Sequence, residues 1–172
     1  DFIHEPFDLV LIDHHTDMQS SIVGDMLSCG NWAKKALQNP FLHRLYLIGP
    51  SKHDLKSAEQ NKVLSFSIEE LEQGATIPLE TKYPVYISID KDVLDERYAM
   101  TNWNQGDMSL GMLEDVLAHF LRNCEVIGID ICGDDPDIDD YPTYIKAERI
   151  NNLSDDALYQ TAMKILKRRQ KK

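Results

Sequence analysis

The stretch FDLVLIDHHTD, residues 7–17, joins an apolar run directly to a group of ionisable side chains. The apolar part, residues 9–12, is rich in Leu and β-branched residues, and it is long enough for a buried strand but short for a helix. Strands that are buried on both faces of a parallel sheet show continuous apolar runs of this kind. We therefore expect this run to form a buried strand of a parallel α/β sheet.

Three ionisable residues, Asp13, His15 and Asp17, follow that run at a spacing of two. In extended chain this spacing turns all three side chains to one side of the strand's C-terminal end. Open α/β sheets bind their ligands at such strand ends. Two carboxylates and an imidazole that converge there suit a hard or borderline divalent metal ion. Taken alone, the pattern also fits a polar strand end that is simply solvated.

A second stretch, PVYISIDKDVLD at residues 84–95, repeats the arrangement. Its apolar run, residues 85–89, leads into Asp90 and Asp92, again at a spacing of two. Carboxylates that crowd together without a cation repel one another, and their pKa values rise. Two strands that each deliver aligned acids from their C-terminal ends therefore predict a metal site rather than two solvated strand ends.

The rest of the chain alternates between short apolar runs and amphipathic stretches. Further strands are expected at residues 45–48, 63–66 and 126–131. Helices are expected at residues 26–38 and after the capping residues Ser67, Ser109 and Ser154. Strands and helices that alternate in this way predict a three-layer α/β/α fold with a mainly parallel sheet. The length of 172 residues fits a single domain, residues 1–172.

Composition narrows the class of protein further. The net charge of −11 argues against a nucleic-acid partner, because phosphate binding needs a basic surface. No apolar run approaches the roughly 18 residues of a membrane span, and the N-terminus does not read as a signal peptide, so we expect a cytoplasmic protein with no membrane partner. The odd number of cysteines, without C-x-x-C spacing, favours reduced thiols. Composition leaves open whether the chain forms a homo-oligomer.

Both acidic stretches resemble signatures of one known family. Residues 13–17 are similar to the D-x-H-x-D metal motif of the arginase, agmatinase and formiminoglutamase superfamily, the ureohydrolases. Residues 88–95 are similar to the S-x-D-x-D-x-x-D signature of the same family. The resemblance extends from residue 7 to about residue 136 with its order preserved, and it implies an arginase-like fold with the metal site at the strand ends.

The resemblance also implies roles for the acidic residues. Asp13 and Asp90 would bridge two metal ions, His15 and Asp92 would complete one of them, and Asp17 would join the other. In ureohydrolases a metal-bound hydroxide attacks a guanidinium carbon, so Asp17 and Asp92 would take part in catalysis through that hydroxide. Oxygen-rich ligation with one imidazole suits Mn²⁺.

The chain departs from the family pattern in several places. No G-G-D-H-type segment precedes the first motif, which indicates a missing N-terminal portion and leaves one metal position incomplete. Asn31 lies in a segment similar to the loop that contacts the substrate's amino-acid end, although an ordinary polar residue at a helix start fits equally well. The family's substrate-binding glutamate falls on Gly133, so Asp134 and Asp135 become the candidates for holding a cationic substrate group.

The function predicted from the sequence is that of a manganese-dependent hydrolase that cleaves a C–N bond of a small guanidino or amidino substrate. Two alternatives stay open. The segment LIDHH also resembles the D-H-H motif of the DHH phosphoesterases, which is likewise a metal site at a strand end. The absence of the family's upstream histidine and glutamate also fits an arginase-like domain that keeps its fold and is catalytically inactive.

Overall fold

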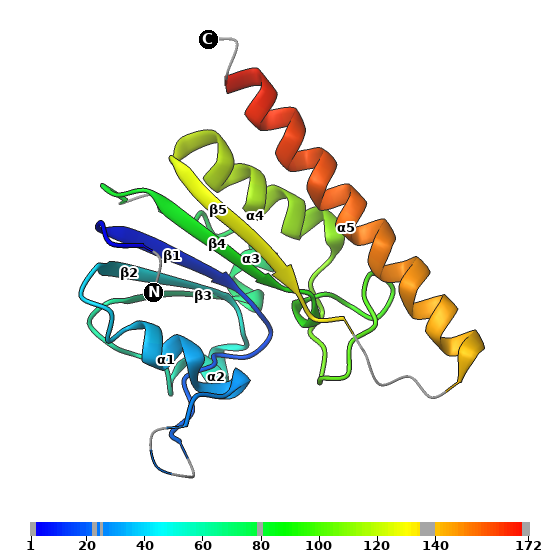
Figure 1. The fold of residues 1–172 in the computed structure, drawn as a ribbon, viewed down its shortest axis with the longest axis horizontal. Coiled ribbons are helices and arrows are strands. Elements are labelled where there is room, and N and C mark those ends of the chain that lie inside the picture. Colours follow the sequence, from blue (N-terminus) through cyan, green and yellow to red (C-terminus); the bar gives the residue numbers. More distant parts are fainter. Residues whose placement is uncertain (1–2, 22–23, 25, 79–80, 135–139, 170–172) are drawn as a thin grey trace.

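A computed structural model describes residues 3–21, 24, 26–78, 81–134 and 140–169. In this part of the chain five strands form one sheet in the order β3-β2-β1-β4-β5, and every neighbouring pair is parallel (Figure 1). The strands are β1 (Phe7–Ile12), β2 (Leu42–Gly49), β3 (Val63–Ser67), β4 (Val85–Asp90) and β5 (Val126–Cys132). The parallel α/β fold predicted from the sequence is confirmed.

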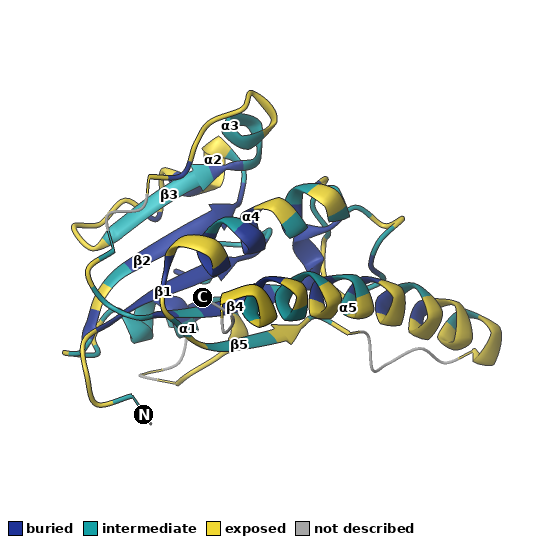
Figure 2. Ribbon diagram, turned by 90° about the horizontal axis from the view of Figure 1, so that it is seen from above, coloured by how far each residue is buried: buried dark blue, intermediate teal, exposed yellow. Residues whose placement is uncertain are grey.

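Helices cover both faces of this sheet. They are α1 (Trp32–Ala36), α2 (Lys52–Leu55), α3 (Ile68–Glu72), α4 (Leu110–Asn123) and α5 (Tyr141–Arg169), with 3-10 turns η1 (Cys29–Asn31) and η2 (Lys91–Val93). The first two helices pack on one face, and α3 and α4 pack on the other. The long helix α5 lies against α4 and extends beyond it (Figures 1 and 2).

The central strand β1 explains the apolar run that opens the chain. All of its residues are buried. Val10 and Ile12 belong to the core under α3 and α4, whereas Leu9 and Leu11 belong to the core under α1 and α2. Because side chains alternate between the faces of a strand, a sheet covered on both sides favours apolar residues at successive positions, and Asp8 is the one polar residue of β1.

Two of the predicted helix starts are confirmed in detail. Ser67 and Glu70 form a capping box at the start of α3, with Ser67 Oγ accepting a hydrogen bond from the Glu70 N–H. Ser109 Oγ accepts one from the Met112 N–H at the start of α4. These side chains satisfy backbone donors that have no partner within the helix.

Two other helix predictions are wrong. The helix expected at residues 26–38 shrinks to η1 and α1, because the Asn31 side chain bonds the Met26 carbonyl and the Ser28 N–H and holds this segment as a loop. Ser154 does not cap a helix; it lies inside α5, where it is buried and donates a hydrogen bond to the Tyr98 carbonyl.

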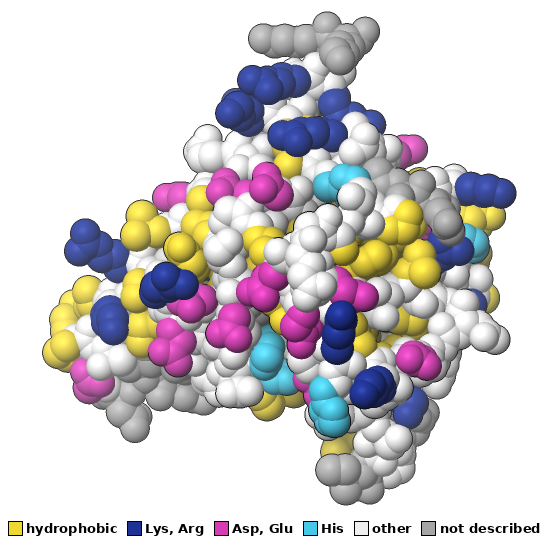
Figure 3. Space-filling model, turned by 180° about the vertical axis from the view of Figure 1, so that it is seen from behind, with side chains coloured by type: hydrophobic (Ala, Val, Ile, Leu, Met, Phe, Trp, Pro, Cys, Tyr) yellow, Lys and Arg dark blue, Asp and Glu magenta, His cyan; other side chains and the backbone are white. Residues whose placement is uncertain are grey.

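Charge is unevenly distributed over the surface. Asp and Glu side chains gather over the middle of the face seen in Figure 3, whereas Lys and Arg side chains gather near its upper end. The last turn of α5 carries Lys167, Arg168 and Arg169, which complement the negative end of the helix dipole. Within the described residues, none of the helices is both long and apolar enough to cross a lipid bilayer.

Candidate metal centre

The C-terminal ends of β1 and β4 meet at a cavity of about 190 Å³. Every residue that the sequence analysis singled out as a metal ligand lines it: Asp13, His15, Asp17, Asp90 and Asp92. The two strands are adjacent and parallel, with Ile12 paired to Ile89, so their C-terminal ends reach the same edge of the sheet. This pairing is what unites two motifs that lie far apart in the chain.

Three potential ligands form the tightest group in this cavity. Donor atoms of Asp13, His15 and Asp92 all lie within 4.8 Å of one another. His15 Nδ1 is 2.8 Å from Asp92 Oδ2 and 3.6 Å from Asp13 Oδ1. The carboxylates of Asp13 and Asp92 are each only 3% exposed, so they cannot rely on bulk water to offset their charge.

Local backbone structure aims these side chains. Asp90 caps the turn η2, and its Oδ1 accepts a hydrogen bond from the Asp92 N–H at 3.0 Å. Asp13 Oδ1 likewise accepts one from the His15 N–H at 2.6 Å. Behind the first motif, Gly49 has a φ of +114°, and a Cβ there would lie 2.6 Å from the Asp13 carbonyl oxygen. Only glycine therefore allows β2 to pass this close to Asp13.

The electrostatics of the cavity favour a bound cation. Burial raises the pKa of Asp13 to about 8 and that of Asp17 to about 6, and burial also raises the pKa of Asp90. The carboxylates of Asp13 and Asp92 raise the pKa of His15 to about 10, although Asp92 makes the closer contact. A divalent cation would relieve the repulsion among these carboxylates, and a set of oxygen donors with one imidazole nitrogen suits such an ion.

Two of the residues predicted to bind substrate, Asn31 and Asp134, make hydrogen bonds within the protein. Asn31 is buried, and its amide group holds its own loop, while its neighbours Ser28, Cys29 and Gly30 line the cavity. Its role in substrate binding stays a prediction. Asp134 accepts a hydrogen bond at 2.6 Å from Lys91 Nζ. Asp135 lies outside the described residues.

Two further features next to the cavity escaped the sequence analysis. Lys91, between the two acids of the second motif, is 1% exposed, although a lysine among acids reads as a surface residue. Gly133 has a φ of +99°, and a Cβ there would lie 2.4 Å from Asp90 Oδ1. The position that aligns with the family's glutamate therefore has no room for a side chain in this structure. Trp103 also lines the cavity, with its ring centroid 6.3 Å from that of His15.

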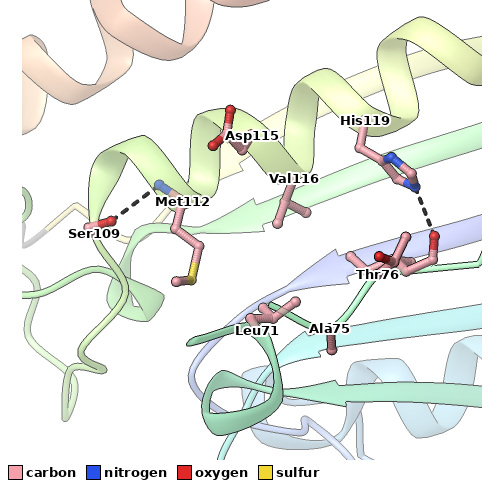
Figure 4. Close-up of a pocket in the computed structure, with 9 residues that line it drawn as sticks. Leu71, Ala75, Thr76, Ser109, Met112, Asp115, Val116 and His119 are labelled. Carbon is pink, nitrogen blue, oxygen red and sulfur yellow. Dashed lines mark hydrogen bonds between the residues drawn. The ribbon is translucent and has the colours of Figure 1, made fainter. Parts of the chain in front are cut away.

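Other hollows in the molecule lack this chemistry. One of about 500 Å³ lies between α3 and α4, where Figure 4 shows Met112 and Val116 directed toward Leu71, and the His119 ring donates to the Ile77 carbonyl. A larger one of about 820 Å³ lies between α1 and the sheet and is lined mainly by apolar side chains. The described residues bring a potential metal-binding group together only at the ends of β1 and β4.

Comparison with known proteins identifies the family of this chain. A model of the arginase family matches residues 1–152. This chain belongs to the arginase family. The resemblance of residues 13–17 and 88–95 to ureohydrolase signatures is thereby confirmed at the level of the family.

One curated protein and several solved structures are similar to this chain. An uncharacterized protein of Thermotoga maritima is 35% identical over 150 residues, which cover 87% of this chain and 56% of that protein. Formimidoylglutamase from Bacillus subtilis superimposes with a TM-score of 0.72 at 18% identity, over 94% of this chain and 54% of that one. A triple mutant of the T. brucei arginase-like protein, bound with Mn²⁺, gives a TM-score of 0.65 at 23% identity, over 92% of this chain and 53% of that one. The chain thus spans about half the length of these relatives.

Proposed function

We propose that this chain carries the metal site of a hydrolase that cleaves a C–N bond in a small guanidino or amidino molecule. The observation that carries the proposal is the convergence of Asp13, His15 and Asp92 in one cavity, with Asp17 and Asp90 beside them. Membership of the arginase family supports metal-dependent hydrolysis as the class of reaction.

We assign the ligands as follows. Asp13, His15 and Asp92 would hold one Mn²⁺ ion, Asp17 and Asp90 would contribute to a second, and Asp13 and Asp90 would be shared by both. Bound divalent ions would supply a nucleophile at neutral pH by lowering the pKa of a coordinated water molecule. The protein contributes the geometry, because the backbone N–H groups of His15 and Asp92 fix the carboxylates of Asp13 and Asp90. Outer hydrogen bonds of this kind orient metal ligands.

Recognition of the substrate follows from the walls of the cavity. Trp103, which is 55% exposed, presents an aromatic wall close to His15, where a planar C–N group can pack. The end of β5 differs from the family pattern, because Gly133 has no side chain and Lys91 already pairs with Asp134. We therefore place the cationic group of a substrate against carboxylates other than Asp134.

Turnover on a small substrate panel tests the proposal. The full 172-residue chain is incubated with Mn²⁺ and guanidino, amidino and phosphate-ester compounds, and release of urea, ammonia or phosphate is measured. We expect cleavage of a C–N bond in the wild type and none in the Asp92→Asn variant. Phosphate as the product would support the phosphoesterase alternative instead, and tight Mn²⁺ binding without turnover would indicate a non-catalytic member of the family.

A further inference from the structure

Helix α5 turns polar side chains toward the interior of the molecule. Asn151 is 5% exposed and Ser154 is 1% exposed, and Asp155 is partly buried beside them. A spacing of three or four residues places side chains on one face of a helix, so all three point the same way. Buried polar groups stabilise a protein only where they find partners, which directs attention to what these side chains contact.

Their partners all belong to residues 91–100, a segment that begins inside the second metal motif and continues beyond it. Asn151 Oδ1 accepts a hydrogen bond from the Met100 N–H at 2.8 Å, and its Nδ2 donates to the Met100 carbonyl at 2.9 Å. Ser154 Oγ donates to the Tyr98 carbonyl. Asp155 Oδ2 accepts a bond from Lys91 Nζ at 3.0 Å, and Lys91 also pairs with Asp134. We call Asn151, Ser154 and Asp155 the α5 clamp.

The segment held by the α5 clamp, residues 91–100, adjoins the candidate metal centre, because Asp92 lines the cavity. Lys91 lies between Asp90 and Asp92 in the chain and begins the turn η2. The segment returns to the cavity, because the Gly106 N–H donates to the Asp92 carbonyl at 2.7 Å. Trp103, which lines the cavity, lies within the loop that this bond closes. A shift of residues 98–100 would therefore reach the cavity through Asp92 on one side and Trp103 on the other.

We propose that the α5 clamp and Lys91 are positioning residues for the metal centre: they fix the loop of residues 91–106 so that Asp92 and Trp103 point into the cavity. The inference rests on the proposed metal-dependent function. Attachment of α5 does not by itself need these polar groups, because Leu158 and Ile165 already bury apolar surface in the core shared with α4. The polar contacts are specific for the loop behind the metal motif.

A matched control exists on the same helix. Thr161 Oγ1 donates to Glu114 Oε1 at 2.6 Å, so it too ties α5 to the body of the protein by a polar side chain. That contact reaches α4 instead of the metal loop. Thr161→Val should therefore loosen α5 without moving Asp92, whereas Asn151→Ala removes two bonds to the metal loop.

An effect of Lys91 through its charge and an effect through positioning predict opposite changes of Mn²⁺ affinity in the Lys91→Met variant. If the ammonium acted on the metal only through its charge, Lys91→Met would strengthen Mn²⁺ binding, because a like charge near the cation would be lost. If Lys91 positions Asp90 and Asp92, the same variant weakens binding. Loss of a residue that orients metal ligands typically lowers metal affinity by about 10–100-fold.

The decisive experiment measures Mn²⁺ affinity of the 172-residue chain from the electron paramagnetic resonance signal of free Mn²⁺. We expect at least about tenfold weaker binding in Asn151→Ala and Lys91→Met, and affinity close to wild type in Thr161→Val. Unchanged or stronger binding in both loop variants would overturn the proposal. Should Asn151→Ala fail to fold, Ser154→Ala removes a single hydroxyl contact and tests the same clamp.

Hydrogen exchange in the metal-free protein gives a second, independent readout. Backbone amides of residues 98–106 should exchange faster in Asn151→Ala than in wild type, and they should be unaffected in Thr161→Val. Equal exchange in the two variants would overturn the clamp. Wild-type protein that binds no Mn²⁺ would instead overturn the proposed metal centre, and exchange alone would then decide whether α5 holds this loop.

Discussion

The Nδ1 atom of His15 lies 2.8 Å from Oδ2 of Asp92, although 77 residues separate the two in the chain. His15 follows β1 and Asp92 follows β4, and the two strands are direct neighbours in the sheet. The contact therefore joins the two acidic motifs at one point. In the metal-free protein it pairs an imidazole with a carboxylate, and a bound cation would take over the role of the imidazole proton.

The Asp92→Asn variant tests the contact between His15 and Asp92 directly. We expect Mn²⁺ to raise the melting temperature of the wild type, because a ligand that binds only the folded state stabilises it by about 2.7 kcal/mol at 100 times its dissociation constant. The Asp92→Asn variant should lose most of that rise. Asp95→Asn is the matched control, because the Asp95 carboxylate pairs with Arg97. Equal loss in both variants would show that Asp95 is a metal ligand.

Binding of Mn²⁺ should strengthen as the pH rises. Metal ligands must be deprotonated, whereas the metal-free protein holds protons on Asp17 up to about pH 6, on Asp13 up to about pH 8 and on His15 up to about pH 10. Each of these protons has to leave when the ion binds. Calorimetric titrations in buffers of different ionisation enthalpy should therefore show proton release at pH 7. A pH-independent affinity between pH 6 and 8 would contradict the ligand assignment.

The same groups set the pH dependence of folding without metal. Asp13 has a folded-state pKa of about 8, above its ordinary value of 3.8, so its stabilising contribution is present at low pH and is lost as the pH rises through about 8. The contribution of the His15 imidazolium to the stability of the fold is complete below about pH 6.5 and is lost as the pH rises through about 10. Metal-free protein should thus melt at a lower temperature at pH 9 than at pH 6, and the Asp13→Asn variant should show a smaller difference. An unchanged difference in that variant would contradict the raised pKa of Asp13.

Much of this centre could be predicted because its determinants are local. The apolar run of β1 and the spacing of Asp13, His15 and Asp17 are properties of one short stretch of chain. The strand β1 ends at Ile12, however, so the turn that follows it, in which Asp17 has a φ of +51°, directs these side chains to the cavity in place of the strand alternation expected from the spacing. The capping box of Ser67 and Glu70 is local in the same sense, since its residues are three apart.

What escaped prediction depends on contacts between distant segments. Ser154 has the residue type of a helix cap, but its hydroxyl is used by the Tyr98 carbonyl, 56 residues away in the chain. Burial of Lys91 depends on Asp134, which follows β5, and Asp155, which lies in α5, because both carboxylates pair with its ammonium group. No pattern in the sequence near Gly133 indicates that the Asp90 carboxylate occupies the space that a side chain at position 133 would need.

Asp134 gives a test of substrate recognition at the end of β5. The sequence analysis made it a candidate for binding a cationic group, but Lys91 Nζ lies 2.6 Å from its carboxylate. Asp134→Asn should therefore leave the affinity for guanidinium compounds within about twofold of wild type, because this carboxylate is already paired with Lys91. Competition by guanidinium in a turnover or binding assay measures this. A loss of tenfold or more, equivalent to about 1.4 kcal/mol, would restore Asp134 as the substrate ligand.

Gly133→Ala should disturb the metal centre from outside the set of ligands. A Cβ at this position would lie 2.4 Å from Asp90 Oδ1 and 2.8 Å from the Lys91 N atom, so either Asp90 or the turn η2 has to move. The φ of +99° adds backbone strain of about 1–3 kcal/mol for a residue with a side chain. We expect both a lower melting temperature and weaker Mn²⁺ binding.

Two other glycines separate these effects. Gly74 also has a positive φ, +80°, but a Cβ there meets nothing within 4 Å, so Gly74→Ala should lower the melting temperature and leave Mn²⁺ affinity unchanged. Gly111 lies in α4 with open space around it, and Gly111→Ala should raise stability by roughly 0.5–1 kcal/mol, because alanine is the better helix former. If Gly133→Ala behaves like Gly74→Ala, losing stability but keeping its Mn²⁺ affinity, then Asp90 tolerates displacement and does not bridge the ions.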